Sequence, residues 1–192
     1  MKQLAIFASG TGSNFDAIVK AIDEGSLDAR VALLVCDRVG AAVIEKAQRH
    51  EIDTVVYTPK LFSDKAAYEA AILEDLRSRN VDWIVLAGYM RLIGPTLLAP
   101  YEGRILNIHP SLLPAFPGKD AVGQALDKQV KVTGVTVHFV DDGMDTGPII
   151  AQEPVHIHRD DSKEDVQRRI QTVEHRLYPE VIQSLLPKEE YK

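Results

Sequence analysis

An asparagine and a histidine stand two residues apart at the end of a short apolar run, in the segment ILNIHP at 105–110. Alternate residues of a strand point to the same side, so Asn107 and His109 share a face. Two hydrogen-bond donors aimed at one oxygen stabilise the negative charge that develops on it. The alternative is a histidine that bonds a local carbonyl. The proline-rich loop at 110–118 favours the functional interpretation, because irregular loops on a rigid scaffold often carry binding and catalysis.

A second candidate is the aspartate loop, the segment DDGMDTGP at 141–148, which holds three carboxylates among two glycines and a proline. It could bind calcium, although the 12-residue ligand spacing and the terminal glutamate of an EF-hand are missing. It could be a solvated turn, as Asp-Gly pairs usually are. It could also bring a carboxylate to His109 and hold the imidazole in its protonated form. The sequence leaves these three interpretations open.

A third candidate is the glycine loop, the segment SGTGSN at 9–14, which lies between an apolar run and a helical pattern. A glycine turn at a helix N-terminus presents free backbone N–H groups and a positive dipole end to an anion. A dinucleotide fingerprint would need a third glycine where Phe15 stands, although Asp37 could act as its ribose-binding acid. A terminal phosphate, held with help from Ser13 and Asn14, is the favoured ligand. A capped turn without a ligand is the plain alternative.

The elements that must position these groups are short apolar strands alternating with amphipathic helices. Apolar runs that end at turn residues predict strands at 3–8, 31–36, 54–57, 83–87, 105–108, 132–140 and 148–155. Helical spacing of apolar residues appears at 15–22, 64–79 and 166–177, the last preceded by a capping signature at Ser162 and Asp165. This alternation predicts an α/β fold: a single Rossmann-like domain with a mostly parallel twisted sheet, helices on both faces and an antiparallel C-terminal portion.

Four local features carry expectations of their own. The alternation at 132–140 predicts a strand with one wetter face. Pro179 is expected to kink or break the last helix, because proline removes a backbone donor. Cys36, at the end of an apolar run, is interpreted as a small core residue. The polar tail at 187–192 is expected to fray.

Composition narrows the class of protein. The chain has 192 residues, with 22 basic and 28 acidic side chains and a net charge of −6, so one domain over 1–192 is expected. The acidic balance argues against nucleic-acid or anionic-membrane partners. No apolar run approaches the ~20 residues of a spanning helix, and neither a signal peptide nor a disulfide is indicated. We therefore expect a cytoplasmic protein. We also expect a monomer or homodimer that acts on small molecules, without a metal.

Taken together, the segments GTGSN, NIHPSLLPAFPG and DDGMDTGPII resemble those of the folate-dependent formyltransferases, in the same order and at similar spacing. The resemblance covers nearly the whole chain. It implies transfer of a formyl group from 10-formyltetrahydrofolate, as co-substrate, to the amine of phosphoribosylglycinamide in purine biosynthesis. It also implies a phosphate-binding half at 1–100 and a catalytic and folate-binding half at 101–192. The catalytic residues that it implies are Asn107, His109 and Asp145.

The resemblance implies ligand contacts residue by residue. The substrate's phosphate and ribose would meet Thr11, Gly12, Ser13, Asn14 and Glu174. The folate would meet Lys65, Met90, Arg91, Leu92, Ile93, Asn107, Asp141, Asp142 and Gly143. Lys65 stands where the family usually has arginine, so the charge is kept but the bidentate fork is lost. The resemblance further implies a cis peptide between Leu113 and Pro114.

Other functions fit parts of the pattern. Within the same chemistry they are a hydrolase of the same folate, or another amine formyltransferase such as the one for methionyl-tRNA. The resemblance gives the first an added N-terminal module and the second an added C-terminal domain, and we expect neither here. From other classes come an NAD-dependent oxidoreductase, which the missing third glycine disfavours, and a noncatalytic ligand sensor, which the intact catalytic residues disfavour.

Overall fold

Seven strands form one sheet in the order β3-β2-β1-β4-β5-β6-β7, in a computed structural model that describes residues 1–186. The parallel strands are β1 (Lys2–Ala8), β2 (Ala29–Cys36), β3 (Thr54–Val56), β4 (Trp83–Leu86) and β5 (Ile105–His109). They are followed by β6 (Val132–Phe139) and β7 (Ile149–His156), and β6 runs antiparallel to both of its neighbours. The expected α/β class, mostly parallel with an antiparallel C-terminal portion, is confirmed.

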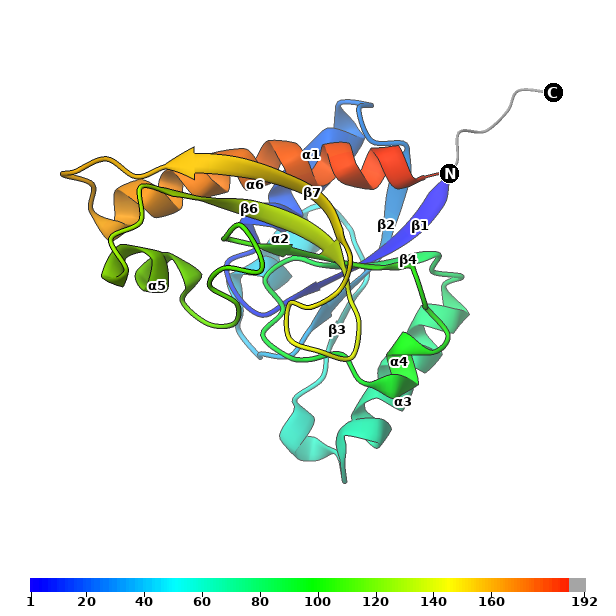
Figure 1. The fold of residues 1–192 in the computed structure, drawn as a ribbon. Coiled ribbons are helices and arrows are strands. Elements are labelled where there is room, and N and C mark those ends of the chain that lie inside the picture. The colour runs from blue at the N-terminus through cyan, green and yellow to red at the C-terminus, as the bar shows by residue number, and fades with distance from the viewer. Residues whose placement is uncertain (187–192) are drawn as a thin grey trace.

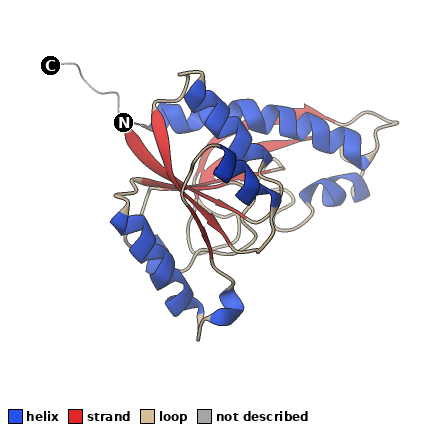
Figure 2. Cartoon of the chain, turned by 180° about the vertical axis from the view of Figure 1, so that it is seen from behind, coloured by secondary structure: helices blue, strands red, loops and turns tan. Residues whose placement is uncertain are grey.

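Helices cover both faces of the sheet, as Figures 1 and 2 show from opposite sides. One face carries α1 (Ser13–Asp23), α2 (Ala42–Arg49), α5 (Ala121–Asp127) and α6 (Lys163–Leu185). The other carries α3 (Lys65–Ser78) and α4 (Pro95–Leu98), with a short 3-10 turn (Pro59–Leu61) before α3. The sequence predicted α1, α3 and α6. The other three helices have only 8, 4 and 7 residues, too few for a clear periodicity.

The two helical layers explain why the central strands are apolar almost throughout. In β1, Ile6 packs with the first layer and Phe7 with the second, and both are fully buried. The strand order reverses between β1 and β4, since β2 and β3 lie on one side of β1 and β4 on the other. In open α/β sheets, ligands bind outside the carboxyl ends of the strands at such a point. The glycine loop follows β1, and Asn107 and His109 end β5, so these candidate groups lie there; the aspartate loop follows β6.

Two local expectations need correction. The expected break of the last helix at Pro179 is wrong, because the helix continues to Leu185. Its residues Tyr178 and Ile182 are buried in the core, and this packing stabilises the helix despite the missing backbone donor. In contrast, the capping box of Ser162 and Asp165 is confirmed.

The second correction concerns β6, which has no wet face. Thr136 and His138, the polar residues of the alternating pattern, are both buried. The strand lies between β5 and β7, and Thr136 is satisfied inside the protein: its hydroxyl donates to the Ser111 carbonyl at 2.7 Å and accepts from the Leu113 N–H at 3.0 Å. An alternating pattern can therefore mark a strand whose polar residues have internal partners.

Three remaining expectations can be placed. Cys36 is buried in the core, as expected. The tail at 187–192 lies outside the described residues. Over residues 1–186, none of the helices combines the length and the apolar character needed to cross a membrane.

Candidate active site

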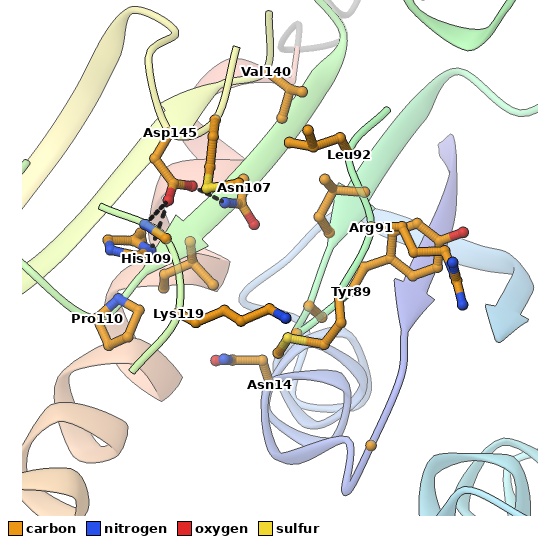
Figure 3. A pocket seen from close by; sticks show the side chains of 18 of the residues that line it. Asn14, Tyr89, Arg91, Leu92, Asn107, His109, Pro110, Lys119, Val140 and Asp145 are labelled. Atoms are coloured by element: carbon orange, nitrogen blue, oxygen red, sulfur yellow. Dashed lines mark hydrogen bonds and ion pairs between the residues drawn. The ribbon is translucent and has the colours of Figure 1, made fainter. Parts of the chain in front are cut away.

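A cavity of about 540 Å³ lies at the carboxyl ends of β1, β4 and β5 (Figure 3). It brings together the glycine loop, the segment after β4, the end of β5, part of the proline-rich loop, the aspartate loop and α6. The lining residues are 10–14, 86–93, 107–110, 118–120, His138, Val140, 143–145 and Glu174. The three segments that the sequence singled out thus border one space.

Asn107, His109 and Asp145 converge on one side of this cavity. The His109 Nδ1 lies 3.4 Å from one oxygen of the Asp145 carboxylate. The Asn107 Nδ2 donates to the other carboxylate oxygen at 3.5 Å. Both contacts are long, and catalytic hydrogen bonds in a ligand-free site often tighten only when the substrate binds. Both side chains also line the cavity, so they face a substrate bound there.

Two of the three interpretations of the aspartate loop, a local turn and a carboxylate that reaches His109, describe different residues of the loop. Asp141 makes a local turn, since it accepts hydrogen bonds from the Gly143 N–H at 3.0 Å and the Thr146 hydroxyl at 2.7 Å. Asp145 reaches the cavity and also accepts the Gly118 N–H at 2.7 Å. No group of three or more His, Cys, Asp or Glu side chains within residues 1–186 could hold a metal ion.

A close backbone approach fixes this loop against β6. A Cβ atom added to Gly147 would lie 1.8 Å from the Phe139 carbonyl oxygen, so only glycine fits there. Asp145 itself has a φ of 57°, a left-handed conformation that aspartate adopts more readily than most residues. The carboxylate thus reaches the cavity through an unusual but well-anchored turn.

The local interpretation of the histidine is confirmed, whereas its role as a donor to a reacting oxygen stays a prediction. The His109 Nε2 lies 2.8 Å from the Phe116 carbonyl oxygen, and a carbonyl only accepts, so Nε2 carries a proton and donates. That bond ties the ring to the proline-rich loop and leaves Nδ1 facing Asp145. The peptide between Leu113 and Pro114 is cis, as the resemblance implied.

The glycine loop forms the other side of the cavity, at the N-terminus of α1. Gly12 caps the helix with a φ of 74°. The Asn14 amide donates to Glu174 on α6 at 3.3 Å, while the Asn14 Oδ1 is buried without a hydrogen-bond partner among the described residues. Thr11 and Ser13 also line the cavity. The loop therefore offers both backbone N–H groups and a polar pair from α1 and α6 to one ligand.

The features of a dinucleotide site are absent from the same loop. Phe15, where the third glycine would stand, is a fully buried core residue. Asp37 is buried too, and the Arg91 Nε donates to its carboxylate at 2.7 Å. The carboxylate that could have bound a ribose is thus occupied by an arginine from the segment after β4.

Replacing Gly12 with alanine is expected to destabilise the protein. The new Cβ would lie 2.6 Å from Val43 Cγ2, and the left-handed backbone would also be strained. We expect the free energy of unfolding in urea to fall by about 2–4 kcal/mol. Gly10→Ala is the matched control, because nothing lies within 4 Å of its added Cβ. Equal stability of the two variants would contradict the proposed packing.

Glu174 should make stability depend on pH. The side chain is 8% exposed, and its burial raises the pKa to about 7 from 4.5, against the smaller lowering effect of the Asn14 hydrogen bond. The folded state binds the proton of the Glu174 carboxyl more tightly than the unfolded state does. The contribution of this protonated carboxyl to the free energy of unfolding is therefore complete below about pH 4.5 and is lost as the pH rises through about 7. Between these pH values we expect the free energy of unfolding to change by up to about 3 kcal/mol because of Glu174, and this change should be absent in Glu174→Gln. Parallel unfolding curves for the two proteins across that window would contradict it.

The segment at 89–94 lines the cavity and is held from several elements. Ser9 Oγ accepts the Met90 N–H at 2.9 Å. On α3, the Tyr68 hydroxyl meets that of Tyr89 at 2.6 Å, and the buried Glu69 accepts the Gly94 N–H at 2.6 Å. Together with the Arg91–Asp37 ion pair, these contacts keep the backbone of Met90, Arg91, Leu92 and Ile93 against the cavity.

Three of the expected folate contacts are not brought to this cavity. Lys65 lines a second cavity of about 430 Å³ that also borders 89–93, and its ammonium lies 3.9 Å from Glu69. Asp141 and Asp142 do not line either cavity. Gly143 does line the main cavity, as expected.

Several residues that line the cavity were not among the expected site residues, His138 and Lys119 among them. The Nε2 of His138, which the alternating pattern placed on the polar face of its strand, lies 3.2 Å from the Asn107 Nδ2. Lys119 lines the cavity, and in Figure 3 its side chain extends from the His109 side toward Asn14 and Tyr89. The alternation of apolar and polar residues in β6 could have indicated His138 as a site residue, since it put Thr136 and His138 on one face of the strand. Nothing in the sequence distinguished Lys119 from other surface lysines.

Comparisons with known proteins agree with this arrangement. Residues 2–182 match the formyl transferase family. The chain is 58% identical to phosphoribosylglycinamide formyltransferase of Bacillus subtilis (strain 168), over 97% of this chain and 95% of that protein. It is 37% identical to the trifunctional purine biosynthetic protein adenosine-3 of Homo sapiens, of which it covers 18%.

Solved structures are equally similar. The crystal structure of glycinamide ribonucleotide transformylase 1 from Geobacillus kaustophilus superposes with a TM-score of 0.95 at 61% identity, covering 97% of this chain and all of that one. Phosphoribosylglycinamide formyltransferase from Bacillus halodurans gives a TM-score of 0.96 at 55% identity, over 98% and 97% of the two chains.

Proposed function

The chain belongs to the formyl transferase family, and on that basis we propose its reaction: transfer of the formyl group of 10-formyltetrahydrofolate to the amine of phosphoribosylglycinamide. It is a formyltransferase of purine biosynthesis, similar over nearly its whole length to enzymes of that name. The observation that carries the proposal is the convergence of Asn107, His109 and Asp145 on a cavity whose opposite side is the glycine loop.

The glycine loop binds the substrate's phosphate. Backbone N–H groups at the start of α1, with Thr11, Gly12 and Ser13, suit a terminal phosphate with its exposed oxygens. Asn14 and Glu174 lie beside them and accept hydrogen bonds from the ribose hydroxyls, which gives the unpartnered Asn14 Oδ1 a donor. Lys119 adds a positive charge to the same cavity.

The folate binds across the segment at 89–94 and the aspartate loop. A pterin needs several hydrogen-bonding partners at fixed positions, and the well-anchored backbone of Met90, Arg91, Leu92 and Ile93, with Gly143, supplies them. Lys65, Asp141 and Asp142 stay proposed contacts for parts of the folate outside the main cavity. On this assignment the folate contacts cross the boundary at residue 100, since 90–93 belong to the first half of the chain.

In the reaction, the substrate amine attacks the formyl carbon and the carbonyl electrons move onto the formyl oxygen. An N–H of Asn107 and the Nδ1–H of a doubly protonated His109, whose Nε2–H stays bonded to the Phe116 carbonyl, donate to that oxygen and stabilise its charge. When the carbonyl re-forms, the bond to the folate nitrogen breaks. The amine loses one proton and the leaving nitrogen gains one. Asp145, next to His109, accepts the first of these and passes it on through water.

An assay of tetrahydrofolate release tests the proposed reaction against its closest rival. The enzyme is incubated with 10-formyltetrahydrofolate, with and without phosphoribosylglycinamide, and absorbance follows the folate product. Release that requires the amine, with formylated amine as the second product, is the expected result. Release in water alone would identify a hydrolase instead. We also propose a monomer or homodimer, which sedimentation of the same sample would distinguish.

A further inference from the structure

His138 lies where a single side chain can control Asn107. In the antiparallel register of β5 and β6, Asn107 stands directly opposite His138, so both side chains lie on one face of the sheet. His138 is only 1% exposed, and its Nε2 lies 3.2 Å from the Asn107 Nδ2. The ring is therefore a fixed neighbour of a group that the proposed reaction uses.

The protonation of the ring follows from its second contact. The His138 Nδ1 lies 2.7 Å from the Phe139 carbonyl oxygen, which can only accept, so Nδ1 carries the proton. In the neutral ring, Nε2 then has a free lone pair, and the Asn107 amide donates to it. Burial lowers the pKa of His138, against the opposing effects of the Phe139 carbonyl and of Asp145 and Asp141, which favours this neutral form.

Two acceptors consequently face the same end of the Asn107 carboxamide. One is the His138 Nε2 and the other is the Asp145 carboxylate oxygen at 3.5 Å. If the carboxamide turned over, its oxygen would meet a lone pair and a carboxylate, and both contacts would be repulsive. The shorter and better-defined contact is the one with the imidazole. The amide hydrogen that makes the longer contact with Asp145 is then the one that can be given to a substrate oxygen.

We propose that His138 is a positioning residue for formyl transfer: by accepting one Asn107 N–H, it holds the carboxamide with its other N–H toward the reacting oxygen. This role rests on the proposed function, because it acts through Asn107. It needs an acceptor at the position of Nε2 and does not need a charge on the ring.

Variants of similar size separate this role from a structural one. His138→Phe keeps a ring but removes the acceptor, and we expect kcat to fall about 10- to 100-fold, with KM for phosphoribosylglycinamide changed less than about twofold. His138→Gln places an amide oxygen near the position of Nε2, and we expect it to restore most of kcat. A structural role would instead move the unfolding midpoint and both KM values, with no rescue by glutamine.

A double variant tests whether His138 works through Asn107. Asn107→Ala combined with His138→Phe should be no slower than Asn107→Ala alone, within about twofold, because the carboxamide to be positioned is already gone. Multiplied losses, or a folded His138→Phe with normal kcat, would overturn the proposal.

A spectroscopic measurement tests the role of His138 independently of the reaction that the enzyme catalyses. Nitrogen-15 shifts of the His138 ring near neutral pH should report a protonated Nδ1 and an unprotonated Nε2. A protonated Nε2 would overturn the positioning role whatever the enzyme catalyses. An unprotonated Nε2 in a protein that transfers no formyl group would instead place the error in the proposed function.

Discussion

His109→Ala is expected to lower kcat for formyl transfer by a factor on the order of 10² to 10³, the usual loss when one donor to an oxyanion is removed. The imidazole faces the cavity beside Asp145, and its N–H acts mainly on charge that develops in the transition state. KM for both substrates should therefore change little. The same loss is expected for Asn107→Ala. Initial rates of tetrahydrofolate release measure both.

This experiment needs a control for folding. His109 also donates to the Phe116 carbonyl, so alanine leaves that acceptor without its partner, at a cost of about 1–3 kcal/mol if the carbonyl stays buried. Thermal unfolding shows whether the variant is folded at the assay temperature. The exposed His50, replaced by alanine, is the matched control and should keep normal rates. A folded His109→Ala whose kcat stays within about threefold of the parent would remove His109 from the reaction.

Asp145→Asn is expected to reduce kcat by about 10² or more, the range for loss of a general acid or base, while phosphoribosylglycinamide still binds. Asparagine keeps the size of the side chain and an oxygen for the Gly118 N–H, but it removes the charge next to His109 and the proton acceptor. Calorimetric titration with phosphoribosylglycinamide should give a Kd close to that of the parent protein, because the proposed phosphate site is on the other side of the cavity.

The neighbouring loop offers a matched control for this variant. Asp142→Asn makes the same chemical change at an exposed position that lines neither cavity. Its rates should be unchanged. If Asp145→Asn also retained normal kinetics, the carboxylate would be only a turn residue, which its φ of 57° and its bond to Gly118 would then explain.

Local physics made much of this protein predictable. A strand of period two, a helix of period 3.6, a capping box and a glycine turn are all written in neighbouring residues. For this reason the strands, α1, α3, α6 and the α/β class could be predicted. The position of Asn107 and His109 on one face also followed, since it depends only on their spacing of two residues in β5.

The site itself drew on residues far apart in the chain. The residues by themselves left open whether a carboxylate of the aspartate loop reaches His109, and the resemblance implied Asp145. The folded loop brings Asp145 to His109 and leaves Asp141 in a turn. The resemblance implied a folate contact for Lys65, and the fold places this residue beside a second cavity that also borders 89–93, so the contact stays a prediction.

What the sequence determined by itself was the strands, the three longest helices and the chemical groups at their ends. The tertiary structure decided which of those groups meet: the contact of Asn107 with His138 depends on the β5–β6 register, and that of Asn14 with Glu174 joins residues 160 positions apart. It also decided that α6 continues through Pro179, because core packing there offsets the lost backbone donor. Such contacts depend on strand order, register and burial, which come from the packing of the whole chain and not from any neighbouring residues.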